Sequence, residues 1–364
     1  MPLADLRAYR PQVEEPTDFD AFWAETLEEA ARAGGDVVAE PYDGGLRAVE
    51  VRDVTFPGWG GQPVKAWLLL PRDRSGPLPA VVEYLGYGGG RALPWHWLTW
   101  SVAGYAHLVM DTRGQGGSGS HAAHTPDIAP DGHGSSGPGF LTRGIEDPRK
   151  HYYRRLITDA VRAVDAVQTF AEVDPSRVAV AGTSQGGGLA LAVAGLRDDV
   201  GALLADVPFL CHVRRAVQIT DAAPYSEVAT WLRGHHTEEQ RAFRTLSYLD
   251  GVNFAARAHC PAWFTTALMD VVCPPSTVFA AANRYAGPSD VQVFTYNGHE
   301  GGGLTDLPRK IEVLHTAFTP PAGAPCTGRP PPVPARPPRA SHPCAALVRP
   351  SVGPAGLEPA TSAV

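Results

Sequence analysis

Long apolar runs are missing from this chain of 364 residues. No stretch approaches the roughly 18 to 20 consecutive apolar residues that a membrane-spanning helix requires. Residues Met1–Asp5 also lack the basic start and the apolar core of a secretory signal peptide. We therefore expect a cytoplasmic protein that has no membrane partner.

Basic clusters and paired cysteines are also scarce. The net charge is -7 and no dense stripe of Lys or Arg is present, so we expect no nucleic acid as a partner, because its phosphates need clustered positive charge. The five cysteines include no C-x-x-C pair, which argues against a disulfide framework and a zinc site. Histidines such as His235 and His236 lack ligand partners at helical spacing, and we expect no metal.

A glycine-rich turn follows one of the short apolar runs that the chain does have. Residues Gly182–Gly186 read GTSQG and come directly after the segment 177–181, RVAVA. A strand that enters a helix through a Gly-x-Ser-x-Gly turn forms a nucleophile elbow, in which glycine permits the close approach of the backbone. The pattern nominates Ser184 as a nucleophile, although an ordinary strand-to-helix turn can carry the same five residues.

Two further residues complete a triad in the chain order Ser, Asp, His that α/β-hydrolases follow. Asp270 comes after the apolar run 262–269, and His299 comes after the run 291–296. Each lies just beyond a predicted strand, and the carboxyl ends of parallel strands meet at one edge of a sheet. We therefore predict Ser184 as the nucleophile, His299 as its general base and Asp270 as the acid that orients the imidazole.

An acyl-transfer site also needs hydrogen-bond donors for the oxyanion. The backbone amide after the nucleophile, that of Gln185, is one predicted donor, and a loop after an early strand usually supplies another. The run 80–85 leads into Gly86–Gly90, GYGGG, where the amide of Tyr87 is our candidate. A surface turn is the plainer interpretation of these glycines, and a phosphate-binding loop is disfavoured because no Gly-Lys-Ser/Thr pattern follows them.

Three motifs together resemble a known family. Residues 113–118 read RGQGGS, residues 182–187 read GTSQGG, and residues 299–300 read HE. This set is similar to the signature of carbohydrate esterase family seven, which contains acetyl xylan esterases and cephalosporin C deacetylases. The resemblance covers about residues 3 to 318.

The resemblance implies the same triad and the same two oxyanion amides. It further implies that Arg113 and Gln115 are structural supports beside the site, and that four residues line the acyl pocket: Trp100, Phe209, Pro224 and Val272. Relatives often have a bulkier isoleucine at the position of Val272, so the acyl pocket of this chain is expected to be slightly larger than theirs. The segment 94–97, PWHW, also departs from the family pattern and leaves the rim of the entrance undefined.

The resemblance also bears on chemistry and assembly. It implies hydrolysis through an acetyl-Ser184 intermediate, with no metal or organic cofactor, on small substrates such as acetylated xylo-oligosaccharides or cephalosporin C. It implies a homohexamer whose active sites face an internal chamber. Two alternatives remain: a broader short-chain esterase or peptidase of the same fold, and a noncatalytic scaffold protein.

The order of elements favours an α/β-hydrolase fold, in which helices flank a mostly parallel twisted sheet. We expect an N-terminal helix from Asp18, capped by Thr17, and a helical excursion over 214–258 that serves as a cap or a subunit interface. Further elements are expected in order along the chain: strands near 49–56, 64–70, 79–85 and 106–111, a loop over the active-site edge at 114–147, and helices at 152–171 and 307–318.

The C-terminal segment differs from the rest of the chain. We assign residues 1–318 to the hydrolase domain and predict that residues 319–364, which are rich in Pro, Ala, Gly and Arg, are disordered. Such a segment has no periodic apolar face with which to offset its ordering entropy. A proline-rich docking segment is the alternative.

Overall fold

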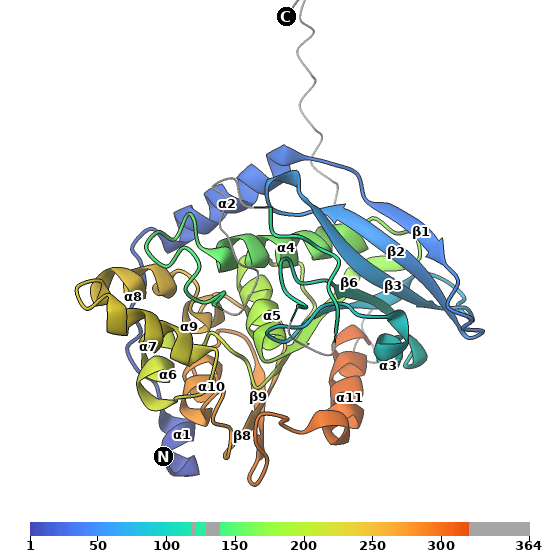
Figure 1. Ribbon diagram of the computed structural model, residues 1–364. Coiled ribbons are helices and arrows are strands. Elements are labelled where there is room, and N and C mark those ends of the chain that lie inside the picture. Colours follow the sequence, from blue (N-terminus) through green and yellow to red (C-terminus); the bar gives the residue numbers. More distant parts are fainter. Residues whose placement is uncertain (118–120, 129–138, 320–364) are drawn as a thin grey trace, which may run out of the picture. The chain divides into compact units, whose positions relative to one another are not determined.

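In the computed structural model of the protein, the elements are arranged around one twisted sheet of nine strands (Figure 1). The structure describes residues 1–117, 121–128 and 139–319. The strands run in the spatial order β1-β2-β3-β5-β4-β6-β7-β8-β9. In chain order they are β1 Val38–Tyr42, β2 Val49–Pro57, β3 Pro63–Pro71, β4 Leu78–Tyr84, β5 Ala106–Met110, β6 Val173–Thr183, β7 Ala202–Asp206, β8 Ala262–Ala267 and β9 Ser289–Phe294.

The sheet has a parallel body and an antiparallel edge. Strands β5, β4, β6, β7, β8 and β9 pair in parallel, whereas β1, β2 and β3 add to β5 as antiparallel neighbours. The mostly parallel sheet expected from the sequence is therefore confirmed. Its parallel strands all end at one edge, which is where α/β proteins bind their ligands.

Helices cover both faces of the sheet, because its central strands are apolar on both sides. Successive side chains of β4 divide between the faces: Val82 joins the core under α4 and α5, and Val81 joins the core under α3 and α11. The helices are α1 Leu3–Ala8, α2 Phe19–Ala33, α3 Leu98–Val102, α4 Tyr152–Val167, α5 Gln185–Leu196, α6 Val213–Ile219, α7 Tyr225–Gly234, α8 Glu239–Ser247, α9 Gly251–Ala255, α10 Pro275–Ala282 and α11 Leu307–Phe318. Short 3-10 turns lie at Trp59–Gly61, Pro94–Trp97 and Gly303–Asp306.

Most predicted elements are present, with two corrections near the N-terminus. The N-cap of α2 is Asp18 rather than Thr17, and its side chain makes no capping hydrogen bond. Strand β1 was not predicted, because VAEPY is polar and contains a proline; such a sequence is tolerated on an edge strand that leaves one side unpaired. The expected helical excursion is present as α6 to α9.

Two predictions fall wholly or partly outside the described residues. The predicted disorder concerns residues 319–364, of which only Thr319 is described. The loop 114–147 is described in part, and its residues Phe140, Leu141 and Ile145 belong to the main core. Within the described ranges, every helix is too short or too polar to span a bilayer.

Candidate active site

Ser184 lies at a sharp turn between β6 and α5. Its backbone has φ +59° and ψ -118°, a conformation that is rare for a residue other than glycine and typical of a nucleophile elbow. A Cβ atom at Gly182 would lie 2.3 Å from the carbonyl carbon of Gly186, and one at Gly186 would lie 2.0 Å from the backbone oxygen of Tyr84. The two motif glycines are therefore required by close packing of the backbone.

The structure brings the three predicted triad residues together. The Nε2 atom of His299 lies 2.9 Å from Ser184 Oγ, and its Nδ1 atom lies 2.9 Å from Asp270 Oδ2. Asp270 is buried, and its Oδ1 atom accepts hydrogen bonds from the amides of Val272 at 2.8 Å and Cys273 at 2.9 Å. With Asp270 holding the proton on Nδ1, the Nε2 lone pair is directed at the serine hydroxyl.

Side-chain amides hold the predicted oxyanion loop against the elbow. Gln115 accepts a hydrogen bond from the amide of Gly88 at 2.6 Å and donates to the Gln185 side chain at 2.9 Å. Gln185 in turn donates to the Leu85 carbonyl at 3.1 Å. These contacts fix the loop that carries Tyr87 relative to the first residue of α5. Gln115 therefore links these two segments, and its role as a structural support stays a prediction.

The side chain of Tyr87 is anchored to the helical excursion. Its hydroxyl donates to Glu227 of α7 at 2.5 Å and accepts from the amide of Phe140 at 3.0 Å. Glu227 also accepts hydrogen bonds from the amides of Gly139 and Leu141. Burial raises the pKa of the Tyr87 hydroxyl, and the Glu227 carboxylate raises it further. Glu227 was not predicted from the sequence, because no local motif marks it.

Arg113 holds a buried ion pair behind the site. Its Nε and Nη2 atoms donate to the two oxygens of Asp159 at 2.5 and 2.8 Å, and Nη1 donates to Gln62 at 2.6 Å. Burial alone lowers the pKa of Arg113, but the Asp159 carboxylate outweighs this effect and raises it. Arg113 lies too deep to meet a substrate, since its side chain is fully buried. Its position suits a support for the surrounding loops.

The four predicted pocket residues divide between the two faces of the sheet. Phe209 is fully buried, its amide donates to the Ser184 carbonyl at 2.9 Å, and its ring lies 6.3 Å from that of Tyr87. Val272 packs against the same core, and the buried Pro224 precedes α7. Trp100 belongs instead to the core between the sheet and the helices α3 and α11.

Asp270, Cys273 and His299 are the one group of described residues whose ligand atoms could meet at a metal, since these atoms lie within 4.8 Å of one another. Asp270 and His299 already bond to each other, and His299 also bonds to Ser184 of the elbow. Burial raises the pKa of the Cys273 thiol well above its usual value, so the thiolate that binds metals or attacks esters is disfavoured. The geometry fits a catalytic triad better than a metal centre.

Known proteins that are similar to this chain include acetyl xylan esterases. Residues 1–314 match the family model described as acetyl xylan esterase. The acetyl xylan esterase from Paenibacillus sp. R4 is 41% identical, with a TM-score of 0.80 and coverage of 86% of this chain and 99% of that one. Acetyl xylan esterase 1 from Thermoanaerobacterium sp. JW/SL YS485 is 31% identical and has a TM-score of 0.79. This match covers 88% of this chain and 99% of that one.

Two relatives with lower sequence identity were also found. The acetyl esterase Axe7A from Xylanibacter ruminicola is 27% identical over 297 residues, which are 80% of this chain and 65% of the relative. The chain thus spans just under two thirds of the length of that curated relative. An acylaminoacyl peptidase from Pyrococcus horikoshii is 13% identical and has a TM-score of 0.54. The match covers 75% of this chain and 41% of the peptidase chain, and it shows a shared fold alone.

Proposed function

Because this chain belongs to the acetyl xylan esterase family, we propose that it is a serine esterase that removes acetyl groups from xylan-derived sugars. The observation that carries the proposal is the continuous hydrogen-bonded path from Ser184 through His299 to Asp270, with both contacts at 2.9 Å. A hydroxyl, an imidazole and a carboxylate in this relation perform acyl transfer in unrelated folds.

The reaction proceeds in two halves. Ser184 Oγ attacks the acetyl carbonyl while His299 Nε2 takes the hydroxyl proton, and the developing oxyanion accepts hydrogen bonds from the amides of Tyr87 and Gln185. The carbon–oxygen bond to the sugar breaks as His299 protonates the departing alcohol, which leaves acetyl-Ser184. Water, deprotonated by His299, then attacks this ester and releases acetate and the free serine.

Phe209, Pro224 and Val272 are the proposed neighbours of the acetyl group, and the amide of Phe209 donates to the Ser184 carbonyl at 2.9 Å in support of this. Cephalosporin C is a second candidate substrate, since it also carries an acetyl ester. This substrate rests on the family resemblance alone. Comparing the turnover of cephalosporin C with that of acetylated xylo-oligosaccharides tests this candidate directly.

We further propose a cytoplasmic homohexamer. The described cysteines Cys211, Cys260 and Cys273 are all free thiols, which suits a reducing compartment. Apolar side chains that follow β8 and β9 are exposed, among them Val271 at 66% and Tyr296 at 91%, and exposed apolar groups of this kind are typical of interfaces. Light scattering after size-exclusion chromatography measures the assembly, and a monomer would contradict it.

The decisive experiment measures acetate release from acetylated xylo-oligosaccharides and cephalosporin C, p-nitrophenol release from p-nitrophenyl esters of increasing acyl length, and cleavage of peptide substrates. Ser184→Ala is expected to abolish turnover, whereas Ser176→Ala, which changes an exposed serine at the other end of β6, is expected to retain it. Faster cleavage of long acyl chains or of peptides would favour the broader hydrolase. A folded wild-type protein without any turnover would favour the noncatalytic scaffold.

A further inference from the structure

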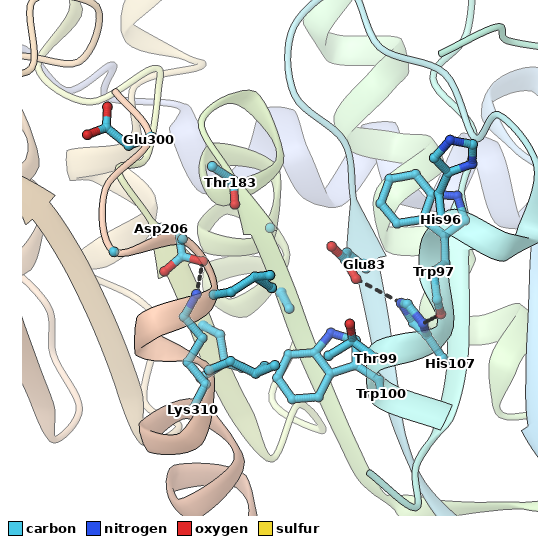
Figure 2. Close-up of a pocket in the computed structure, with 17 residues that line it drawn as sticks. Glu83, His96, Trp97, Thr99, Trp100, His107, Thr183, Asp206, Glu300 and Lys310 are labelled. Carbon is cyan, nitrogen blue, oxygen red and sulfur yellow. Dashed lines mark hydrogen bonds and ion pairs between the residues drawn. The ribbon is translucent and has the colours of Figure 1, made fainter. Parts of the chain in front are cut away.

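A cavity of about 280 Å³, lined by both polar and apolar side chains, lies on the α3 and α11 side of the sheet, beside the candidate active site. Figure 2 shows Glu83 of β4 and Thr183 of β6 on its sheet wall, Trp97 and Trp100 on one flank, and Lys310 on the other. Thr183 directly precedes the nucleophile in the chain. We call this space the α3–α11 cavity. Neither the triad mechanism nor the acetyl pocket accounts for it.

The α3–α11 cavity adjoins the oxyanion loop. A second hollow of about 320 Å³ is lined by Gly86–Gly90, and it shares three lining residues with the cavity: Glu83, Trp97 and Thr183. A substrate whose acetyl carbonyl lies at the oxyanion amides can therefore extend its alcohol portion past Thr183. Phe209, which we propose lies beside the acetyl group, belongs to the core on the opposite face of the sheet. Acyl and alcohol portions thus have separate places on the two sides of the elbow.

Hydrogen-bonding groups in the cavity are held in place by their neighbours. Glu83 Oε2 lies 2.8 Å from His107 Nε2, and His107 Nδ1 lies 2.9 Å from the Trp97 carbonyl (Figure 2). The Glu83 side chain keeps 24% of its surface exposed, so its other oxygen remains able to accept a hydrogen bond from a ligand. A sugar ring has hydroxyl groups at its rim and apolar C–H groups on its faces. The Glu83 carboxylate can accept hydrogen bonds from such hydroxyl groups, and the flat indole rings of Trp97 and Trp100 can pack against the apolar faces.

The charges of the cavity favour a neutral ligand. Three carboxylates line it, those of Glu83, Asp206 and Glu300, against the single ammonium group of Lys310. Lys310 forms an ion pair with Asp206 (Figure 2). Among the described residues, no further lysine or arginine lines the cavity, and Glu83 has the imidazole of His107 at 2.8 Å as its one basic neighbour there. A ligand carboxylate placed here would meet like charges and would be disfavoured.

We propose that the α3–α11 cavity is the subsite for the neutral sugar ring that leaves in the reaction, with Glu83 as a hydroxyl-binding residue and Trp97 and Trp100 as its aromatic walls. This inference rests on the proposed function and makes it more specific. It assigns Trp100 to the alcohol portion of the substrate instead of the acetyl pocket. It also predicts that neutral acetylated xylosides are better substrates than cephalosporin C, whose core carries a carboxylate.

Steady-state kinetics of Glu83→Gln and Trp100→Phe test this subsite with two acetyl esters. Acetylated xylotriose reaches the cavity, whereas ethyl acetate is too small to do so. Losing a hydrogen bond to a charged acceptor is expected to lower kcat/KM for the sugar ester about tenfold in Glu83→Gln, mainly through KM. The value for ethyl acetate should stay within about twofold, because this ester makes no such bond. Glu312→Gln, an exposed change on α11 outside the lining, is the matched control.

The kinetics also test the charge argument. Removing the negative charge at Glu83 should raise kcat/KM for cephalosporin C relative to the sugar ester. Equal losses on the sugar ester and on ethyl acetate would overturn the subsite and indicate a general disturbance of the oxyanion loop.

A binding measurement separates the subsite from the esterase activity itself. Xylotriose without acetyl groups is titrated into Ser184→Ala and followed by calorimetry, with and without the added change Glu83→Gln. We expect binding that weakens about tenfold with the second change. Absence of binding by Ser184→Ala would overturn the subsite even if the wild-type protein is an esterase. Binding without any wild-type turnover would keep the subsite and reject the proposed reaction.

Discussion

Asp270 has both of its carboxylate oxygens committed, one to His299 and the other to two backbone amides. Asp270→Asn keeps the shape of the side chain but removes the charge that holds the proton on Nδ1. We expect kcat for acetyl ester hydrolysis to fall by about 10³ to 10⁴, because the imidazole adopts the wrong tautomer. Circular dichroism checks that the fold is retained. Activity within tenfold of wild type would contradict the orienting role of Asp270.

At the scale of elements, Asp250 joins two helices of the excursion. It accepts hydrogen bonds from Val252 in the first turn of α9, and from His212 and Val213 at the start of α6. Burial raises the pKa of Asp250 to about 6, although the amides act in the opposite direction. Its usual pKa is 3.8, so the folded protein binds more protons than the unfolded chain between about pH 4 and 6.

The free energy of unfolding should therefore decrease as the pH rises through that window, by up to about 3 kcal/mol from this group. Urea unfolding of wild type and Asp250→Asn at several pH values between 4 and 7 measures the difference. The variant cannot titrate here and should lack this part of the slope. Asp198→Asn, at an exposed position, serves as the control. Identical slopes for Asp250→Asn and wild type would contradict the prediction.

At the scale of the whole molecule, Arg113 joins segments that are far apart in the chain. It bonds to Asp159 of α4 and to Gln62, which directly precedes β3. Arg113→Met leaves Asp159 as a buried charge without its partner and is expected to cost about 3–5 kcal/mol. The double change Arg113→Met with Asp159→Leu removes both charges and should recover much of that loss. Chemical denaturation measures both, and equal stability of the single and double variants would exclude an uncompensated charge as the cause.

The chemistry of the elbow was predictable from the sequence because its signals are local or fixed in chain order. The glycines around Ser184 follow from backbone crowding that any sequence with this turn must satisfy. Asp270 and His299 each follow an apolar run, and parallel strands bring such positions to one edge. The roles of these residues remain predictions, whereas the fold and the family are established.

Contacts between distant segments could not be predicted in the same way. Glu227 anchors Tyr87 across 140 positions of sequence, and no short pattern records that pairing. Strand β1 has a polar sequence whose strand conformation comes from its pairing with β2. Both required the positions of neighbours that only the folded chain supplies.

The amino-acid sequence alone was enough to predict a nucleophile, its partners and most of the elements, because backbone sterics and strand order act along the chain. Which face of the sheet each lining residue occupies became clear from the folded chain alone. The fold separated Trp100 from Phe209 and placed Glu83 beside His107. Packing of α3 and α11 against the sheet brings together residues that are far apart in the chain, since Trp100 and Leu314 belong to one core.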